Sequence, residues 1–289
     1  MFLNILGALW GGSFLFMRVA APVLGPFLLI DLRVLIAGFA LLIYAYAIRK
    51  MPDFRQKWKQ YLLLGAVNAA IPFTMIATAE LHVTASVSSI LNATTPLFAL
   101  LAAAIWLKER LRAGKMLSMF IGIAGVAILA GWHLGHSPIV LLSIFFSLVA
   151  SVCYGIGGVY TKLHFASEAP LTLAIGQQLA AGLVLLPFSV PTVGRLQGMT
   201  ISIAVSVFCL AVLSTSVGYL IYFYLIKSVG PTKTLSVTLL VPLYGVIWGM
   251  LLLGERLSVG TVAGLVLILS STIMITETKL GAGSRRTVS

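Results

Sequence analysis

The chain has 289 residues, of which 60% are hydrophobic and only 9% are charged. A soluble domain averages roughly 45–50% apolar and about 25% charged residues, so this composition excludes a soluble globular protein. The chain contains 19 Lys and Arg against 7 Asp and Glu. In a soluble protein that excess would indicate nucleic-acid binding, whereas in a membrane protein it marks the loops on the cytoplasmic side. We therefore expect the chain to lie in a lipid bilayer and to bind no nucleic acid.

Ten apolar runs follow one another along the chain, and each is close to the length of about 20 residues that a helix needs to cross a bilayer. The expected spans are residues 3–21, 27–48, 61–79, 85–107, 114–131, 138–160, 170–189, 200–226, 233–253 and 259–276. Strands of an outer-membrane barrel would alternate lipid-facing with polar residues and be less hydrophobic. The predicted fold is therefore an all-α integral membrane protein with ten transmembrane helices.

The loops differ in charge between the two sides of the membrane. Ten spans place both chain ends on one side, where the loops contain fifteen Lys and Arg residues, whereas the opposite loops contain three, Arg18, Arg195 and Arg256. Since basic loops stay in the cytoplasm, we expect both termini there. The first span has no basic segment before it, which argues against a cleaved signal peptide.

The two halves of the chain resemble each other. TPLFALLAAAIWLKERLRAG at 95–114 aligns with VPLYGVIWGMLLLGERLSVG at 241–260, at an offset of 146 residues. Earlier in each half the offset is 144, which pairs Trp10 with Tyr154. One internal duplication explains both alignments.

The duplication predicts the domain organisation. Each unit holds five spans, and because five is odd, the second unit inserts into the membrane in the opposite orientation. We expect the two inverted-topology repeats at residues 1–132 and 138–276, followed by a disordered cytoplasmic tail at 277–289. Inverted repeats are typical of secondary transporters, because two similar halves can exchange roles about a pseudo-twofold axis.

Each unit also has a proline-containing helix followed by Glu-Arg-Leu, at 109–111 and 255–257, and then a helix rich in small residues. This tandem arrangement resembles the EamA-type ten-helix members of the drug/metabolite transporter superfamily over nearly the whole chain. The resemblance implies a bacterial-type inner-membrane exporter, closest to the amino-acid and metabolite branch. We expect a protein that functions as a monomer and exports small metabolites, amino acids with aromatic or apolar side chains among them, by alternating access. A drug or nucleobase/nucleoside exporter of the same fold is the alternative.

Two prolines lie at equivalent positions in the fourth and ninth spans. Proline lacks an N–H and clashes with the carbonyl four residues earlier, so Pro96 and Pro242 should free the carbonyls of Asn92 and Thr238. Interrupted helices in corresponding positions are the best sequence indication of a transport site. We predict Pro96 and Pro242 as hinges and Asn92 and Thr238 as substrate ligands. Hydrogen bonding within the same helix or between helices is the alternative for such polar side chains.

Aromatic residues lie deep within spans, away from the interfaces where they usually anchor membrane helices. Trp10 and Tyr154 are equivalent residues of spans one and six, Phe73 and Tyr219 are equivalent at offset 146, and Tyr222 adds another ring. A cavity of rings and hydroxyls suits a solute with an apolar or aromatic side chain and a polar head. We predict that these five residues bind substrate in a cavity lined by spans one, three, four, six, eight and nine. Ordinary packing is the alternative.

Charged residues within or at the ends of spans are rare and are treated as functional candidates. Asp31 and Arg33 lie just inside span two, Arg18 and Glu80 end spans one and three, and Lys162 is the counterpart of Arg18. We predict these five as gating candidates, while an Arg18–Asp31 ion pair or a snorkelling Arg33 is the structural alternative. Span one has no central carboxylate, so a tightly bound organic cation is not expected. Proton-coupled and facilitated transport both stay open.

Other patterns favour packing or helix-end contacts. Glu109 and Glu255 begin tight turns, which is typical of a salt bridge or of a contact with a helix end. Gly7 and Gly11 form a small-xxx-small pair that lets helices approach closely, and a second such pair begins at Gly245.

No residue pattern indicates catalysis. GIGG at 155–158 lies within a span, outside the strand–turn–helix context of a dinucleotide loop. His133 and His136 have no evident third metal ligand, and no acidic cluster is present to hold Mg²⁺. Cys153 and Cys209 lie in apolar runs and are interpreted as small buried residues. We therefore predict no enzyme, no cofactor and no metal, with an integral-membrane enzyme or a channel as alternatives from other classes.

Overall fold

The computed structural model describes residues 1–108, 113–132, 138–234 and 236–283, and these ranges contain helices and no strand. Eight helical segments are long and apolar enough to cross a bilayer, and two shorter apolar helices, Val237–Leu253 and Val259–Ile275, bring the number to ten. The prediction of an all-α, ten-helix membrane fold is confirmed.

The first half of the chain supplies five of these segments, and two of the five are divided into shorter helices. In chain order they are α1 (Phe2–Leu24), α2 (Pro26–Ala47), α3 (Trp58–Gly65) with η1 (Ala66–Ala70) and α4 (Ile71–Ala79), α5 (Ala85–Asn92) with α6 (Thr95–Trp106), and α7 (Ala113–Trp132).

The second half repeats this order. Its helices are α8 (Pro138–His164), α9 (Pro170–Ser189) with η2 (Val190–Gly198), α10 (Ile201–Phe208) with η3 (Cys209–Val217) and α11 (Gly218–Val229), the short α12 (Pro231–Thr234), α13 (Val237–Leu253), and α14 (Val259–Gly283).

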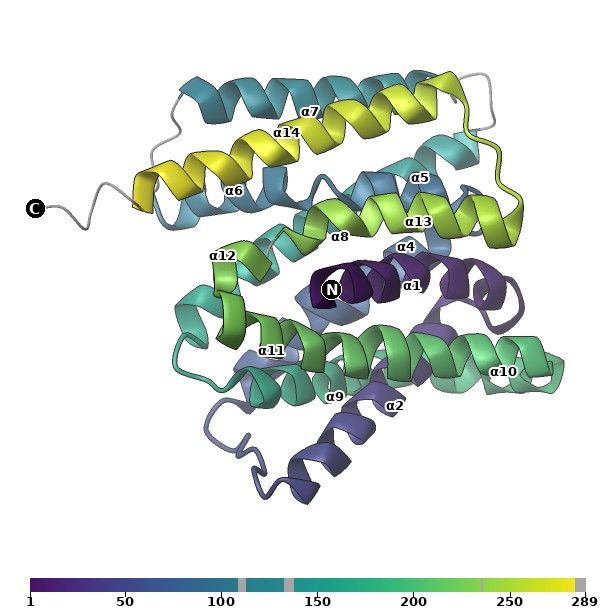
Figure 1. Ribbon diagram of the computed structural model, residues 1–289. Helices are drawn as coiled ribbons and strands as arrows, with labels where there is room; N and C mark the ends of the chain where they lie inside the picture. Colours follow the sequence, from purple (N-terminus) through teal and green to yellow (C-terminus); the bar gives the residue numbers. More distant parts are fainter. Residues whose placement is uncertain (109–112, 133–137, 235, 284–289) are drawn as a thin grey trace, which may run out of the picture.

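The two halves pack with the pattern that a twofold axis produces. α2 contacts α9 and α7 contacts α14, so each of these helices meets its own counterpart. α1 is equivalent to α8, and α13 is equivalent to α5 with α6, so the contact between α1 and α13 matches the contact of α8 with α5 and α6. In the same way, the contact of α8 with α4 matches the contact of α1 with η3 and α11. In Figure 1, α1 runs toward the right of the view and α14 runs toward the left, as an even number of crossings requires.

Two equivalent segments depart from the α-helical geometry. The third and eighth spans each contain a π-helical stretch, η1 and η3, and these overlap at the offset of 146 that relates the later parts of the repeats. Such insertions are frequent at functional sites because they redirect side chains and loosen the helix. Nothing in the residue pattern AVNAA or CLAVLSTSV distinguishes them from ordinary helix.

The fourth span breaks where the proline pattern predicts it. α5 ends at Asn92 and α6 begins at Thr95, with Pro96 in the first turn of α6. Pro96 has no N–H to donate, which kinks or breaks a helix, and α5 ends before it. The ninth span differs, because α13 runs through Pro242 as one helix.

The tail predicted to be disordered from residue 277 is corrected in part. α14 continues to Gly283, because the segment TETKLGA contains no proline to end the helix. Three other residues singled out from the sequence, Glu109, His133 and His136, lie outside the described residues.

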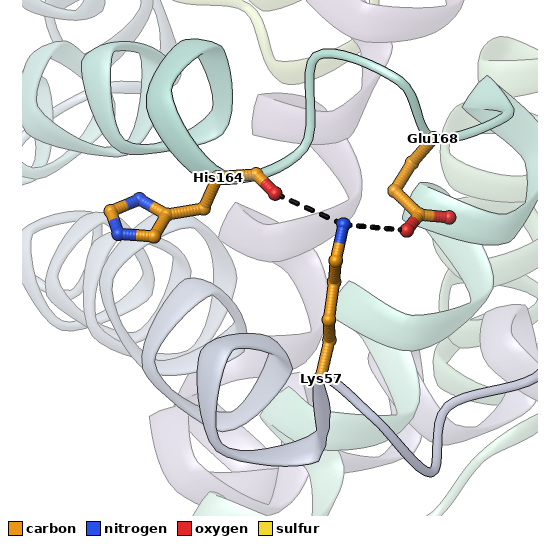
Figure 2. A network of polar contacts seen from close by, with 3 residues as sticks. All are labelled: Lys57, His164 and Glu168. Atoms are coloured by element: carbon orange, nitrogen blue, oxygen red, sulfur yellow. Dashed lines mark hydrogen bonds and ion pairs between the residues drawn. The ribbon is translucent and has the colours of Figure 1, made fainter.

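The longest polar connection, between α2 and α3, is held against the second half at one end of the bundle. Lys57 Nζ donates to Glu168 Oε1 at 2.8 Å and to the carbonyl oxygen of His164 at 3.2 Å, as Figure 2 shows. This ion pair is partly exposed, so we expect it to contribute no more than about 1 kcal/mol to stability.

Candidate functional site

A cavity of about 330 Å³ lies where the two halves meet. Its wall is formed by side chains from seven of the ten spans, the six that the sequence analysis named together with span two. The lining residues are Trp10, Ser13, Phe14, Met17, Arg33, Asn68, Phe73, Ile76, Asn92, Ala93, Thr95, Pro96, Tyr154, Ser214, Thr215, Tyr219, Tyr222, Thr238, Val241 and Pro242.

All seven residues proposed from the sequence as substrate ligands line this one cavity, together with both predicted hinge prolines. Their role in binding stays a prediction, but the structure brings them to one place from six separate spans. The seven are Trp10, Phe73, Asn92, Tyr154, Tyr219, Tyr222 and Thr238, and the prolines are Pro96 and Pro242.

The cavity wall follows the repeat. Most of its residues form pairs that are equivalent in the two halves, at offset 144 in the first pair and 146 in the others. The pairs are Trp10 with Tyr154, Asn68 with Ser214, Phe73 with Tyr219, Ile76 with Tyr222, Asn92 with Thr238, Thr95 with Val241, and Pro96 with Pro242. The cavity therefore lies on or close to the pseudo-twofold axis, where a transport site is expected.

The aromatic side chains form two groups of contacting rings in the cavity wall. The Trp10 ring contacts Tyr222 at a centroid distance of 5.4 Å and Tyr219 at 6.3 Å. On the other side of the pseudo-twofold, Phe73 meets Tyr154 edge to face at 6.1 Å. Gly218 leaves room for the indole, since a Cβ there would lie 2.7 Å from Trp10 Nε1. These rings offer a flat apolar surface on which an aromatic or apolar group can stack.

A chain of amides and a hydroxyl fixes one side of the cavity. Asn68 Nδ2 donates to Gln177 Oε1 at 2.8 Å, and Gln177 Nε2 donates to the Tyr219 hydroxyl at 3.1 Å. Asn68 and Gln177 were missed by the sequence analysis, because one amide in an apolar run gives no indication of which way it faces. Applying the offset of 144 residues to Arg33 would have found Gln177, whereas Ser214, the counterpart of Asn68, carries no such signal.

Polar atoms without partners occur in the same wall. Asn92 Oδ1 and Ser214 Oγ are buried and form no hydrogen bond within the described part of the chain. The prediction that the main-chain carbonyl of Asn92 is free is wrong, since its oxygen accepts a hydrogen bond from Thr95 Oγ1 at 2.7 Å. The side-chain amide of Asn92, rather than its carbonyl, is thus available to a solute.

Arg33 does not snorkel, which corrects the structural alternative given for it. Its side chain is only 5% exposed and lines the cavity. Arg33 Nε donates to Thr215 Oγ1 at 3.1 Å, and the guanidinium carbon lies 3.7 Å from the centre of the Phe73 ring. The cation–π contact and the hydroxyl hold the guanidinium on the cavity side of α2.

The other charged candidates lie outside the cavity lining. Arg18 donates to the carbonyl oxygen of Glu80, and Asp31 accepts from Ser189, so the Arg18–Asp31 ion pair that was the structural alternative does not form. Each of these bonds joins two different spans. Lys162, at the end of α8, is exposed.

Metal and disulfide sites are not found in the described part of the chain. No group of three His, Cys, Asp or Glu residues there could hold a metal ion. Cys153 and Cys209 are free, and they are partly exposed rather than buried as expected.

Comparison with known proteins shows which family the chain resembles. The model of the EamA-like transporter family matches residues 1–131 and 141–277. A protein of Archaeoglobus fulgidus named an uncharacterized transporter is 25% identical over 263 residues, covering 90% of this chain and 92% of that protein. The uncharacterized inner membrane transporter YedA of Escherichia coli K12 is 28% identical over 254 residues, covering 86% of this chain and 81% of YedA.

A solved crystal structure shares the fold. It superposes with a TM-score of 0.64 at 19% sequence identity, covering 99% of this chain and 98% of the other. The likeness extends over both repeats, and at this identity it concerns the fold alone.

Proposed function

The chain belongs to the EamA-like transporter family, and we propose that it is a secondary transporter that exports small metabolites, apolar and aromatic amino acids among them, by alternating access. One observation carries the proposal. The cavity between the repeats is walled by equivalent residues of both halves and combines aromatic rings with a few polar groups. Such a wall suits a solute with an apolar body and a polar head.

The helix interruptions support the transport mechanism. Span four breaks between α5 and α6, α13 contains Pro242, and π-helical stretches lie in spans three and eight. All four sites lie beside or within the cavity wall. Because the two repeats have opposite orientations, exchanging their conformations would open the cavity first to one side of the membrane and then to the other.

The direction of transport is part of the proposal. The excess of Lys and Arg in the loops on the side of the termini favours a cytoplasmic location for both ends. The name of the E. coli relative, an inner membrane transporter, supports the same membrane for this chain. We propose that solute enters from the cytoplasm, binds between Trp10, Asn92 and Tyr154, and leaves on the outer side.

Counterflow in proteoliposomes tests the proposed function. Liposomes preloaded with unlabelled phenylalanine should accumulate labelled phenylalanine transiently above the equilibrium level, because a carrier exchanges solute across the membrane. Nucleobases and organic cations serve as the comparison panel, with and without a pH gradient. A pore would show no transient accumulation, and a membrane enzyme would return a chemically altered solute. Counterflow with nucleobases alone would favour the alternative exporter and contradict the amino-acid proposal.

A further inference from the structure

Among the described residues, Arg33 is the one basic side chain that lines the cavity, and no Asp or Glu among them lines it. The side chain is 5% exposed. A guanidinium that is withdrawn from water inside a bilayer is costly unless a partner of opposite charge compensates it.

The contacts that Arg33 makes are all with neutral groups. Nε donates to Thr215 Oγ1 at 3.1 Å, Nη1 points to the Met17 sulfur at 3.6 Å, and the Phe73 ring lies on one face. A guanidinium has five N–H donors, and a thioether sulfur is a weak acceptor. Within the described residues Nη2 has no hydrogen bond, so at least part of the planar fork is free to bind a ligand.

No acidic residue compensates Arg33 at close range. Across the described ranges the one ion pair within 4.0 Å joins Lys57 to Glu168, on the surface. Asp31 accepts from Ser189 instead. Glu80 interacts with Arg33 electrostatically, but its side chain is fully buried and neither carboxyl oxygen has a hydrogen bond. Glu80 also lies next to Arg18, which donates to its carbonyl oxygen, so Arg33 shares this carboxyl with a second guanidinium and forms no ion pair with it within 4.0 Å.

The pseudo-twofold supplies an internal comparison. The counterpart of Arg33, at offset 144, is Gln177, which is neutral and has hydrogen bonds at both its amide oxygen and its amide nitrogen, with Asn68 and Tyr219. Phe73, which Arg33 stacks on, is the counterpart of Tyr219. Neutral side chains from both repeats thus satisfy Gln177 in the second repeat, whereas the equivalent position of the first repeat carries an incompletely bonded cation.

We propose that Arg33 binds the carboxylate of the transported solute and that the cavity selects a carboxylate, with an ammonium group dispensable. The inference rests on the proposed transport function and narrows its substrate class to small carboxylates bearing an apolar or aromatic group. A carboxylate matches the planar donor fork of a guanidinium. An ammonium group would find neutral acceptors such as Asn92 Oδ1 in the described wall, but no acid.

Ligand binding to the purified protein tests this inference independently of transport. The probes are 3-phenylpropionate, 3-phenylpropanamide and 2-phenylethylamine, titrated against the tryptophan fluorescence of the full chain in detergent. We expect the acid to bind at least roughly tenfold more tightly than the amide of the same shape, because the amide has no negative charge and only one acceptor oxygen for the guanidinium fork. The amine should bind no better than the amide. Equal affinities of acid and amide, or no binding of the acid, would overturn the inference.

Substitution of Arg33 tests the residue itself. Arg33→Gln should weaken binding of 3-phenylpropionate by roughly 10–100-fold and change binding of the amide by no more than about threefold. Arg33→Lys, which keeps the charge but loses the fork, should retain part of the preference for the acid. Arg55→Gln, at an exposed arginine in the loop before α3, is the matched control.

The two proposals fail in different ways. If Arg33→Gln keeps the full preference for the acid while the wild-type protein shows counterflow, the inference is wrong and the transport function stands. If the preference depends on Arg33 but no solute shows counterflow, the carboxylate site stands and the transport function fails. If Arg33→Gln does not fold, the probe series on the wild-type protein and on Arg33→Lys decides.

Discussion

Gly11→Ala is expected to destabilise the folded protein strongly, by about 2 kcal/mol or more, because a methyl group there has no space. A Cβ at Gly11 would lie 2.7 Å from the Cβ of Tyr244 and 2.8 Å from both the backbone nitrogen of Gly245 and the carbonyl oxygen of Val241. Two of these neighbours are main-chain atoms of α13, so relief requires α1 and α13 to separate. The separation would also move Trp10, which lines the cavity.

The adjacent glycine provides a matched control. At Gly12 the nearest atoms to an added Cβ are 3.7 Å away, which is ordinary contact. Alanine favours helix over glycine by about 1 kcal/mol at both positions, so Gly12→Ala should be neutral or slightly stabilising. Thermal unfolding in detergent measures both variants. Equal stability of Gly11→Ala and the wild-type protein would show that the α1–α13 contact is looser than the structure has it.

Glu255→Ala is expected to have the second large effect, because Glu255 joins the second repeat to the first. One carboxylate oxygen accepts from the backbone N–H of Ala85 at 2.8 Å, and the other accepts from the backbone N–H of Ser86 at 3.0 Å and from the Ser86 hydroxyl. These N–H groups begin α5 and have no partner within the helix, and the helix dipole favours an anion there. The predicted helix-end contact of Glu255 is confirmed.

Removing the carboxylate takes the acceptor from three partly buried donors, so we expect a loss of roughly 2–4 kcal/mol in the free energy of unfolding. Glu255→Gln keeps an acceptor oxygen and should lose about half as much. Glu168→Gln, which removes the exposed ion pair drawn in Figure 2, is the control and should cost no more than about 1 kcal/mol. Chemical unfolding of the three variants measures the difference. A Glu255→Ala variant as stable as Glu168→Gln would contradict the assigned helix-end role.

The sequence was sufficient for the fold and for much of the cavity wall. Ten apolar runs predict ten spans because burial in lipid leaves few alternatives to a helix. The repeat offset paired Trp10 with Tyr154 and Phe73 with Tyr219, and the structure brings all four to one cavity. Internal symmetry was informative because equivalent residues of two inverted halves approach the same axis.

Other features could not be predicted, because they depend on contacts between residues that are far apart in the sequence. Arg33 lies only a few residues from the start of α2, so its depth along the membrane suggested snorkelling, while its direction is set by Thr215 and Phe73 from other spans. The residue preferences of η1 and η3 do not distinguish these π-helical stretches from α-helix. Asp31 has its partner, Ser189, in the opposite half, a pairing that no local spacing could indicate.

Counterflow by variants of the cavity wall tests most directly whether the cavity between the repeats is the transport site. Trp10→Ala and Asn92→Ala each remove a contact surface or polar group from the wall, and we expect each to reduce counterflow of labelled solute at least roughly tenfold. Phe120→Ala, at a side chain that is 66% exposed on α7, should transport at the wild-type rate. Wild-type rates in both Trp10→Ala and Asn92→Ala would show that solute crosses elsewhere.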